Sequence, residues 1–334
     1  MNRQRHTVSV HFVRAFLRGA SRLGLDHEPL LQQSLLNPQM VASPQLRITS
    51  EQLSRVARGI WLAGDDELLG LSNYPLRFGV FGLFAKQTVH CTSLREVYRH
   101  LCAFYNLVGK AFQLEFIEAG ERARLTMRLT DPQLDDDHAM CEFLTLMWHR
   151  FPSWLIGRRI PLLRIQFEFS EPAHSQEYQL MYPCPVEFEQ PVNCLEFERS
   201  TLDAKILQTP DSLHRYLKRI PFDWFKQQSY YPVYAREVVN ILKQHNSYSD
   251  LDMDSVATAM HVTSRTLRRK LADEHTSFQT LKDNLRRDAA IHLLSRPNTP
   301  IASIAEQLQF SDPAAFTRAF KSWTGVSPSL YRKV

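Results

Sequence analysis

The sequence predicts an α+β N-terminal domain of helices plus a small antiparallel sheet. An all-α C-terminal domain follows, with two helix-turn-helix units joined by a long helix. The chain has 334 residues, enough for about two domains of roughly 150 residues each. Apolar spacing is helical at first and then alternates, which is typical of an α+β domain. From residue 233 it is helical throughout, and one helix–turn–helix pattern occurs twice. We therefore expect domains over 1–200 and 233–334, with a linker region over 201–232.

The first hundred residues are predicted to be helical, because apolar residues recur there at intervals of three and four. The expected helices cover Thr7 to Leu23, a short segment from Pro29, a segment from Thr49 or Ser50 through Trp61, and Leu94 to Val108. Ser93 and Glu96 form a capping box that fixes the start of the last of these helices. Phe78 to Ala85 is apolar at nearly every position, so we expect it to be buried all round.

Alternating hydrophobicity then predicts the sheet. The expected strands are Phe112 to Ile117, Arg122 to Leu129, Leu163 to Phe169, Val186 to Phe188 and Leu195 to Phe197. The first two flank a short turn containing Gly120 and form a hairpin. A long helix, His138 to Leu155, and a short one around Gln176 to Met181 lie between strands. Asp135 to Asp137 precede the long helix, as helix-capping carboxylates or as a site for a cationic effector or a metal.

The linker region, 201–232, has no steady period and contains Pro210, Pro221 and Pro232, with a short helix expected near Ser212 to Arg219. Beyond it, helices are predicted over Val233 to His245, Ser277 to Leu294, Ile301 to Leu308 and Asp312 to Trp323. The segment Asp252 to Leu271 supplies two further short helices separated by a turn.

The C-terminal domain contains an internal repeat. An offset of 48 residues joins Met253 with Ile301, Val256 with Ile304, Ala257 with Ala305, Met260 with Leu308 and Val262 with Phe310. After the turn the offset is 49, and it joins Leu267 with Phe316, Arg269 with Arg318 and Leu271 with Phe320. Self-similarity of this kind indicates a duplicated structural unit. Alanine at the equivalent positions 257 and 305 allows the two helices of each unit to cross closely.

The second helix of the first unit is basic. Val262 to Leu271 has four basic residues and no acidic one. Arginine can bond guanine bidentately in the major groove, which discriminates by about 1–3 kcal/mol per pair. The connecting helix, Ser277 to Leu294, would be about 27 Å long at roughly 1.5 Å per residue. A helix of that length could hold two second helices in successive major grooves, which lie about 34 Å apart. The alternative for these arginines is a solvated helix face.

Composition and residue spacing argue against several other classes of protein. Net charge is +5, and residues 236–334 hold 14 Lys and Arg against 10 Asp and Glu. The 11 glycines form neither a GxGxxG nor a GxxxxGK[ST] pattern, so we expect no cofactor of the kind those loops bind. The five cysteines have no CxxC spacing, which argues against zinc and favours the cytoplasm. His138 and His149 lie on one predicted helix without an evident third ligand, so no metal is expected. Apolar runs fall short of ~18 residues, so no membrane span is expected.

The segment Pro300 to Arg332 resembles the signature of AraC/XylS-type transcriptional regulators. The features that agree are Ile304-Ala305, Phe310, Phe316, Arg318, Phe320, Trp323, Gly325, Ser327-Pro328 and Tyr331-Arg332. The resemblance covers about Val233 to Val334 and implies base contacts from Arg265, Arg268 and Arg269 in the first unit and Ala314, Thr317 and Arg318 in the second. Ser264 and Lys321 complete the expected DNA-binding set. His261 and Gln309 stand where the family often has glycine, so each turn is expected either to be strained at positive φ or to be differently shaped.

The N-terminal part resembles the sensor domain of the subgroup with an "arabinose-binding-like" domain, which includes ornithine- and arginine-responsive regulators. The matching residues are Gly24-Leu25, Phe81 to Leu83, Thr92 to Leu94 with Glu96, and Cys184 to Phe188. This resemblance implies a small-molecule effector, a homodimer and, for an activator, contact with RNA polymerase. Phe78, Phe81, Tyr105 and Trp148 are candidates for the effector pocket, and ordinary core packing is the alternative for each of them.

Together these features predict a cytoplasmic, sequence-specific transcriptional regulator, expected to be an activator, that binds double-stranded DNA and is not an enzyme. Two alternatives stay open. A DNA-binding unit could be fused to a catalytic domain for alkyl transfer or repair, although the scattered cysteines do not supply the required cluster. A ligand-independent DNA-binding interaction protein is the other.

Overall fold

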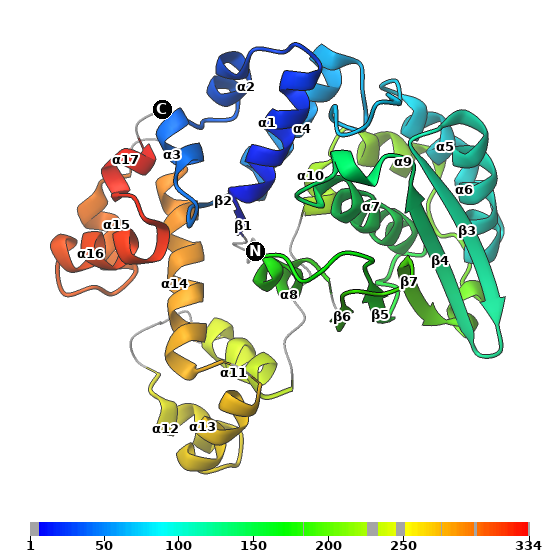
Figure 1. Cartoon of the computed structure of the whole chain (residues 1–334). Helices are drawn as coiled ribbons and strands as arrows, with labels where there is room; N and C mark the ends of the chain where they lie inside the picture. Colours follow the sequence, from blue (N-terminus) through cyan, green and yellow to red (C-terminus); the bar gives the residue numbers. More distant parts are fainter. Residues whose placement is uncertain are drawn as a thin grey trace. The chain divides into compact units, whose positions relative to one another are not determined.

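The computed structural model describes residues 7–182, 184–225, 233–244, 251–274, 276–296 and 299–332. They form two compact units (Figure 1). Unit 1 contains Met1–Val10, Leu35–Thr49 and Tyr230–Val334, and unit 2 contains His11–Ser34 and Ser50–Ser229. Among the described residues, no helix combines the length and the apolarity that a membrane crossing requires.

Unit 2 has the predicted α+β composition. Its first helices are α1 (His11–Arg22), α2 (His27–Gln33), α4 (Ser50–Gly64), α5 (Val80–Thr88) and α6 (Leu94–Val108). Its strands are β3 (Phe112–Ala119), β4 (Arg122–Leu129), β5 (Leu162–Gln166), β6 (Val186–Glu187) and β7 (Asn193–Glu198). The remaining helices are η1 (Pro132–Leu134), α7 (Ala139–Leu155), η2 (Ser175–Glu177), α8 (Tyr178–Met181), η3 (Arg199–Asp203), α9 (Pro210–Leu217) and α10 (Phe222–Phe225).

The sheet of unit 2 has the order β3-β4-β7-β5-β6, and its pairs are antiparallel except for β5 with β6. The hairpin of β3 and β4 turns at Gly120, whose φ of +56° suits glycine. Helix α7 is the central element, since every one of its residues except Trp154 is buried. It packs against β7, α1 and α10, so residues on α7 can meet groups from several parts of the chain.

The described residues of unit 1 are helical apart from one short sheet. Its elements are β1 (Thr7–Ser9), α3 (Pro38–Ala42), β2 (Arg47–Thr49), α11 (Val233–Gln244), α12 (Met253–Ala259), α13 (Ser264–Asp273), α14 (Phe278–Leu294), α15 (Ile301–Gln307), α16 (Pro313–Thr324) and α17 (Pro328–Arg332). The predicted fold class, α+β followed by all-α with two helix-turn-helix units and a long connecting helix, is confirmed.

Two local predictions in the N-terminal part were wrong. The helix expected from Thr7 begins at His11, because Thr7–Ser9 form β1 and pair antiparallel with Arg47–Thr49. The Thr7 hydroxyl donates to Asp288 Oδ1 of α14 at 2.5 Å, which ties this short sheet to the C-terminal helices. The stretch Phe78 to Ala85 is not buried all round, since Phe78 is 42% and Leu83 57% exposed.

The described part of the expected linker region packs with unit 2. Helix α9 falls near the predicted short helix and carries a Thr209 capping box. In α10, Trp224 and Phe225 are buried, and the indole N–H of Trp224 donates to the Tyr216 hydroxyl at 2.8 Å. The unit boundary falls at Ser229 and Tyr230. We therefore propose that the sensor domain extends through α10, beyond the 1–200 division drawn from the sequence.

Candidate DNA-binding surface and ligand pocket

In the first helix-turn-helix unit, one face of α13 is held against the core and the other is exposed. Leu267 and Leu271 are buried, in a core shared with Val256 and Ala257 of α12. Arg265, Arg268 and Arg269 are exposed, and their spacing of three and four residues places them side by side on a helix. Thr263 caps α13 by accepting from the Thr266 N–H at 3.2 Å. Ser264 is half-buried and donates its hydroxyl to Asp254.

The second helix-turn-helix unit repeats this arrangement with fewer charged residues on the exposed face of its second helix. Phe316 and Phe320 of α16 are buried, as are Ile304 and Ala305 of α15. Asp312 caps α16 by accepting from the Ala315 N–H at 2.7 Å. Ala314, Arg318 and Lys321 are exposed, and Thr317 is half-buried with its hydroxyl donating to the Pro313 carbonyl at 2.8 Å. The candidate contact positions of both units therefore face outward or lie at the edge of the exposed face.

The turns of the two units share an unusual backbone conformation. His261 has φ of +56° and Gln309 has φ of +58°. This left-handed conformation costs a non-glycine residue about 1 kcal/mol or more. Of the two expectations for these turns, the structure shows positive φ at both positions, the conformation that glycine adopts readily.

We expect His261→Gly to stabilise the protein by about 0.5–1 kcal/mol, because His261 is exposed and glycine removes the backbone strain without loss of packing. The matched control is His261→Ala, which removes the same ring but keeps a Cβ at positive φ. Thermal unfolding of the three proteins measures the difference. Equal unfolding temperatures for the glycine and alanine variants would show that backbone strain at this turn is negligible.

Helix α14 is shared by the two helix-turn-helix units, which lie toward its opposite ends in Figure 1. It contacts α11, whose side chains complete the first unit's core, and it contacts α15, α16 and α17 of the second. Its 17 residues span about 26 Å at roughly 1.5 Å per residue. The Arg286 guanidinium lies 5.3 Å from the centre of the Phe310 ring, which connects α14 to the second turn.

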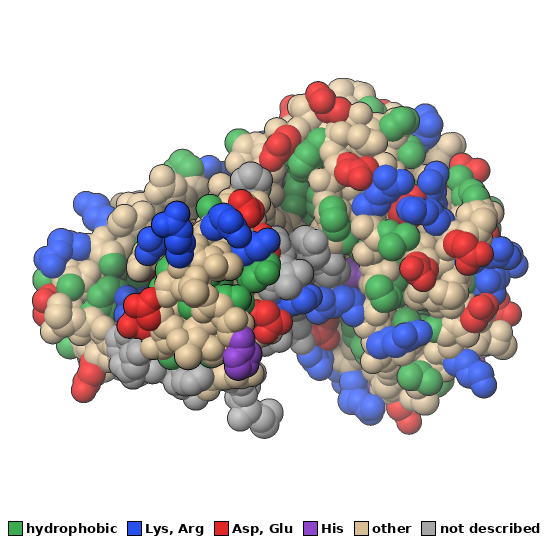
Figure 2. Space-filling model, turned by 90° about the horizontal axis from the view of Figure 1, so that it is seen from below, with side chains coloured by type: hydrophobic (Ala, Val, Ile, Leu, Met, Phe, Trp, Pro, Cys, Tyr) green, Lys and Arg blue, Asp and Glu red, His purple; other side chains and the backbone are tan. Residues whose placement is uncertain are grey.

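Charges of both signs are spread over the visible face of the molecule (Figure 2). The candidate contact positions form a local arginine face on α13 and a less charged polar face on α16, and the visible face shows no single extended basic field. This agrees with the modest net charge of +5.

Three of the four aromatic residues predicted for the effector pocket lie in the core of unit 2. Phe81, Tyr105 and Trp148 are no more than 2% exposed, and the rings of Tyr105 and Trp148 are 4.7 Å apart. Phe78 is exposed beside Trp61, at 6.0 Å between ring centres. Among the three carboxylates before α7, Asp135 accepts from the N–H groups of Met140 and Cys141, so it caps the helix.

A pocket of about 600 Å³ opens at the C-terminal end of α7, against α9 and α10. Five of the described residues that line it are arginines, Arg150, Arg158, Arg159, Arg215 and Arg219. Trp154 and Tyr216 form an aromatic wall, with stacked rings 4.2 Å apart. None of the four aromatic residues proposed from the sequence lies among the residues lining this pocket.

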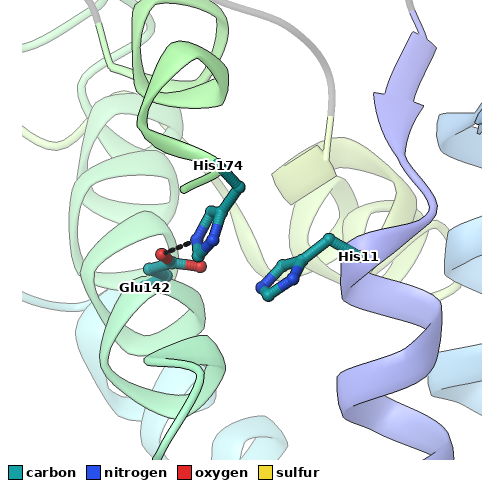
Figure 3. Close-up of side chains that lie close together, drawn as sticks. All are labelled: His11, Glu142 and His174. Atoms are coloured by element: carbon teal, nitrogen blue, oxygen red, sulfur yellow. Dashed lines mark hydrogen bonds and ion pairs between the residues drawn. The ribbon is translucent and has the colours of Figure 1, made fainter. Parts of the chain in front are cut away.

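A second polar cluster lies between α1, α7 and the segment that leads into η2 (Figure 3). One ligand atom from each of His11, Glu142 and His174 lies within 4.8 Å of the other two. His174 Nε2 is 2.6 Å from Glu142 Oε1, which also accepts from the Tyr178 hydroxyl. Glu142 Oε2 is buried and has no hydrogen-bond partner among the described residues.

The electrostatics of this cluster favour neutral groups. Burial raises the pKa of Glu142 well above its ordinary value and lowers the pKa of His174, while burial and then His174 lower the pKa of His11 to about 3. These pKa shifts favour the neutral forms of Glu142 and His174 over an ion pair in their contact. Two neutral imidazoles and a carboxylate are also ligands suited to a first-row metal ion. These residues could hold one if the atoms moved closer together and Glu142 lost its proton.

Sequence reasoning missed both the arginine pocket and this cluster. The pocket's arginines come from α7, the turn after it and the region of α9, and only the adjacent Arg158 and Arg159 form a visible local signal. His11, Glu142 and His174 are separated by 131 and 32 residues, so no motif spacing marks them. His138 and His149, the histidines noted in the sequence, are not part of the cluster.

Two helix-turn-helix units on one shared helix, each with an outward polar second helix, define a DNA-binding protein. The chain belongs to the AraC family of transcription regulators. Residues 24–206, more than half of the chain, match the family described as "Arabinose-binding domain of AraC transcription regulator", and residues 256–334 match "Helix-turn-helix domain". It is thus a DNA-binding transcriptional regulator with an N-terminal domain of the ligand-binding type.

The chain is also similar to individual proteins. The ornithine utilization regulator of Pseudomonas aeruginosa is 24% identical over 328 residues, which cover 98% of this chain and 96% of that protein. The regulator VqsM of the same organism is 36% identical over 78 residues, covering 23% of this chain and 24% of VqsM. The crystal structure of the transcriptional regulator CdpR from Pseudomonas aeruginosa aligns with 97% of this chain and 98% of its own, at 20% identity and a TM-score of 0.32.

Proposed function

We propose that this chain binds one DNA site with both helix-turn-helix units, placing α13 and α16 in successive major grooves on one side of the duplex. The observation that carries the proposal is the single helix α14, whose Phe278 and Leu281 belong to the core of the first unit and which contacts α15 and α16 of the second. Both second helices turn a capped, polar face outward, as groove binding requires. A helix of about 26 Å with one unit toward each end could hold the two second helices about one groove repeat, roughly 34 Å, apart.

In this proposal the first unit supplies most of the base reading. Arg265, Arg268 and Arg269 can each reach guanine, whereas the second unit presents Arg318 beside the smaller Ala314 and Thr317. Ser264 and Lys321 would contact the DNA at the ends of these faces, most simply at phosphates. Arginine at three neighbouring positions also provides local positive charge, which strengthens binding at low salt.

The proposed control is by a small-molecule effector bound to unit 2. The chain would act in the cytoplasm as a homodimeric activator that contacts RNA polymerase, and it would have no catalytic activity. Effector binding would change the population of DNA-competent arrangements. The family assignment and the name of the ornithine utilization regulator support an effector-responsive activity for this chain.

Selection of bound DNA from a random pool, with and without candidate effectors, tests the proposal. We expect recovered sites to contain two preferred segments about one helical turn apart, roughly 10 base pairs. We also expect at least one effector to change the yield of the selection. Recovery of random sequence under every condition would contradict sequence-specific binding.

A further inference from the structure

The pocket at the end of α7 contains a buried cation with unused donors. Arg150 is 4% exposed, and its Nη2 donates to the Met181 carbonyl at 2.5 Å. Its Nε and Nη1 atoms are buried without a hydrogen-bond partner within the part of the chain that the structure describes. A buried guanidinium N–H without an acceptor is costly, since it has lost water and gained nothing in return.

The surroundings of Arg150 add positive charge rather than cancel it. Burial and then the nearby Arg159 lower the pKa of Arg150 to about 9, so the group is still largely protonated at neutral pH. Burial also lowers the pKa of Arg159. The acidic residue among the described lining residues is Asp223, whose carboxylate is already 2.8 Å from Arg219. The described lining residues therefore leave the positive charge of Arg150 and Arg159 uncompensated, and a bound anion would compensate it.

We propose that this pocket is the effector site, and that the effector is a small organic anion bound through a carboxylate or phosphate group to Arg150 and Arg159. This assignment rests on the proposed effector control, since it supplies the effector's chemical class. Guanidinium groups bind both kinds of anion through paired hydrogen bonds. The stacked rings of Trp154 and Tyr216 offer an apolar wall to the remainder of the molecule.

The position of the pocket suits a regulatory site. Arg150 lies on α7, the central helix of unit 2, whereas Arg215 lies on α9 and Arg219 follows it. An anion bound to Arg150 and Arg159 would also lie beside Arg215 and Tyr216, which line the same pocket, so it would fasten α9 to α7. Helices α9 and α10 are the last described elements of unit 2 before the chain continues into unit 1 at Tyr230. The ligand would therefore bind next to the part of the chain that leads to the helix-turn-helix units.

Thermal unfolding of the full chain tests the anion site, with citrate, benzoate and inorganic phosphate as probes and sodium chloride at equal ionic strength as the reference. We expect a saturable rise in unfolding temperature with at least one probe. A response to citrate or benzoate identifies a carboxylate ligand, and a response to phosphate alone identifies a phosphoryl group. No rise with any of the three would overturn the proposal.

Two variants and a control locate the binding. Arg159→Gln, at an exposed position, should raise the apparent Kd of the responding probe by about tenfold. Arg150→Met should abolish the response and also raise the unfolding temperature without probe, because it removes a buried uncompensated charge. Arg128→Gln, an exposed position on β4 outside the pocket, should change neither. An unaltered response in Arg159→Gln, or a lower probe-free unfolding temperature in Arg150→Met, would contradict the assignment.

Measurements of DNA binding distinguish failure of the anion-site proposal from failure of the proposed effector control or DNA binding. Without probe, Arg159→Gln should bind DNA as the wild type does; weaker binding would assign these arginines to nucleic acid and overturn the effector site. If the probe binds the wild type through Arg150 but leaves DNA affinity unchanged, the anion site stands and effector control fails. If the probe binds but no specific DNA site is recovered, the DNA-binding proposal fails alone.

Discussion

Replacement of Ala289 by proline is expected to destabilise unit 1 by ~3 kcal/mol or more and to abolish binding to the full DNA site. Ala289 is fully buried within α14. Proline there removes a helical hydrogen bond, and its ring clashes with the preceding turn. Phe278 and Leu281 of this helix belong to the core of the first helix-turn-helix unit, and α15 and α16 of the second unit contact the same helix. A kink therefore changes the spacing of the two units as well as their stability.

Thermal unfolding and a gel-shift titration on the full site measure the two effects of Ala289→Pro. Ala289→Gly is the matched control, because it loosens the helix by about 1 kcal/mol without a kink and should retain binding. Unchanged affinity of Ala289→Pro for the full site would show that simultaneous binding by the two units is not required.

The second large effect is expected for Arg268→Ala, which should weaken binding to the selected site by about 1–3 kcal/mol and relax base preference at one position. Arg268 is exposed between Arg265 and Arg269 on the outward face of α13, whose other face is fixed by Leu267 and Leu271. The loss should therefore reflect contact with DNA and leave folding intact.

Titrations on the selected site and on random DNA distinguish the kinds of contact that Arg268 could make. Arg236→Ala is the matched control, since Arg236 is an exposed arginine of the same unit on α11, outside both second helices. We expect it to leave base preference unchanged. An equal loss for Arg268→Ala on both DNAs would indicate that Arg268 contacts phosphate only.

The parts of the fold that the sequence predicted well are those specified by neighbouring residues. Helix α6 covers the predicted range because Ser93 accepts the Glu96 N–H at its start and Gly109 follows its end. The hairpin of β3 and β4 was predictable because its alternating strands are joined by a short turn. Strand β1 was missed because it is three residues long and its partner, Arg47–Thr49, lies about forty residues away along the chain.

The same distinction explains which functional residues were predictable. Each helix-turn-helix unit is local, so the repeat in the sequence indicated which residues are buried and which face outward. The arginine pocket combines α7 with residues some sixty positions later, and the unpaired donors of Arg150 follow from its burial there. Aromatic residues such as Tyr105 and Trp148 suggested a pocket from composition, but they pack against one another in the core.

The most direct test of two-unit binding is hydroxyl-radical footprinting of the full chain on its selected DNA site. Two protected segments about 10 base pairs apart on one face of the duplex are expected. Arg268→Ala should weaken protection of one segment and Arg318→Ala that of the other. A single protected segment, reduced in the same way by both variants, would contradict the placement of α13 and α16 in successive grooves.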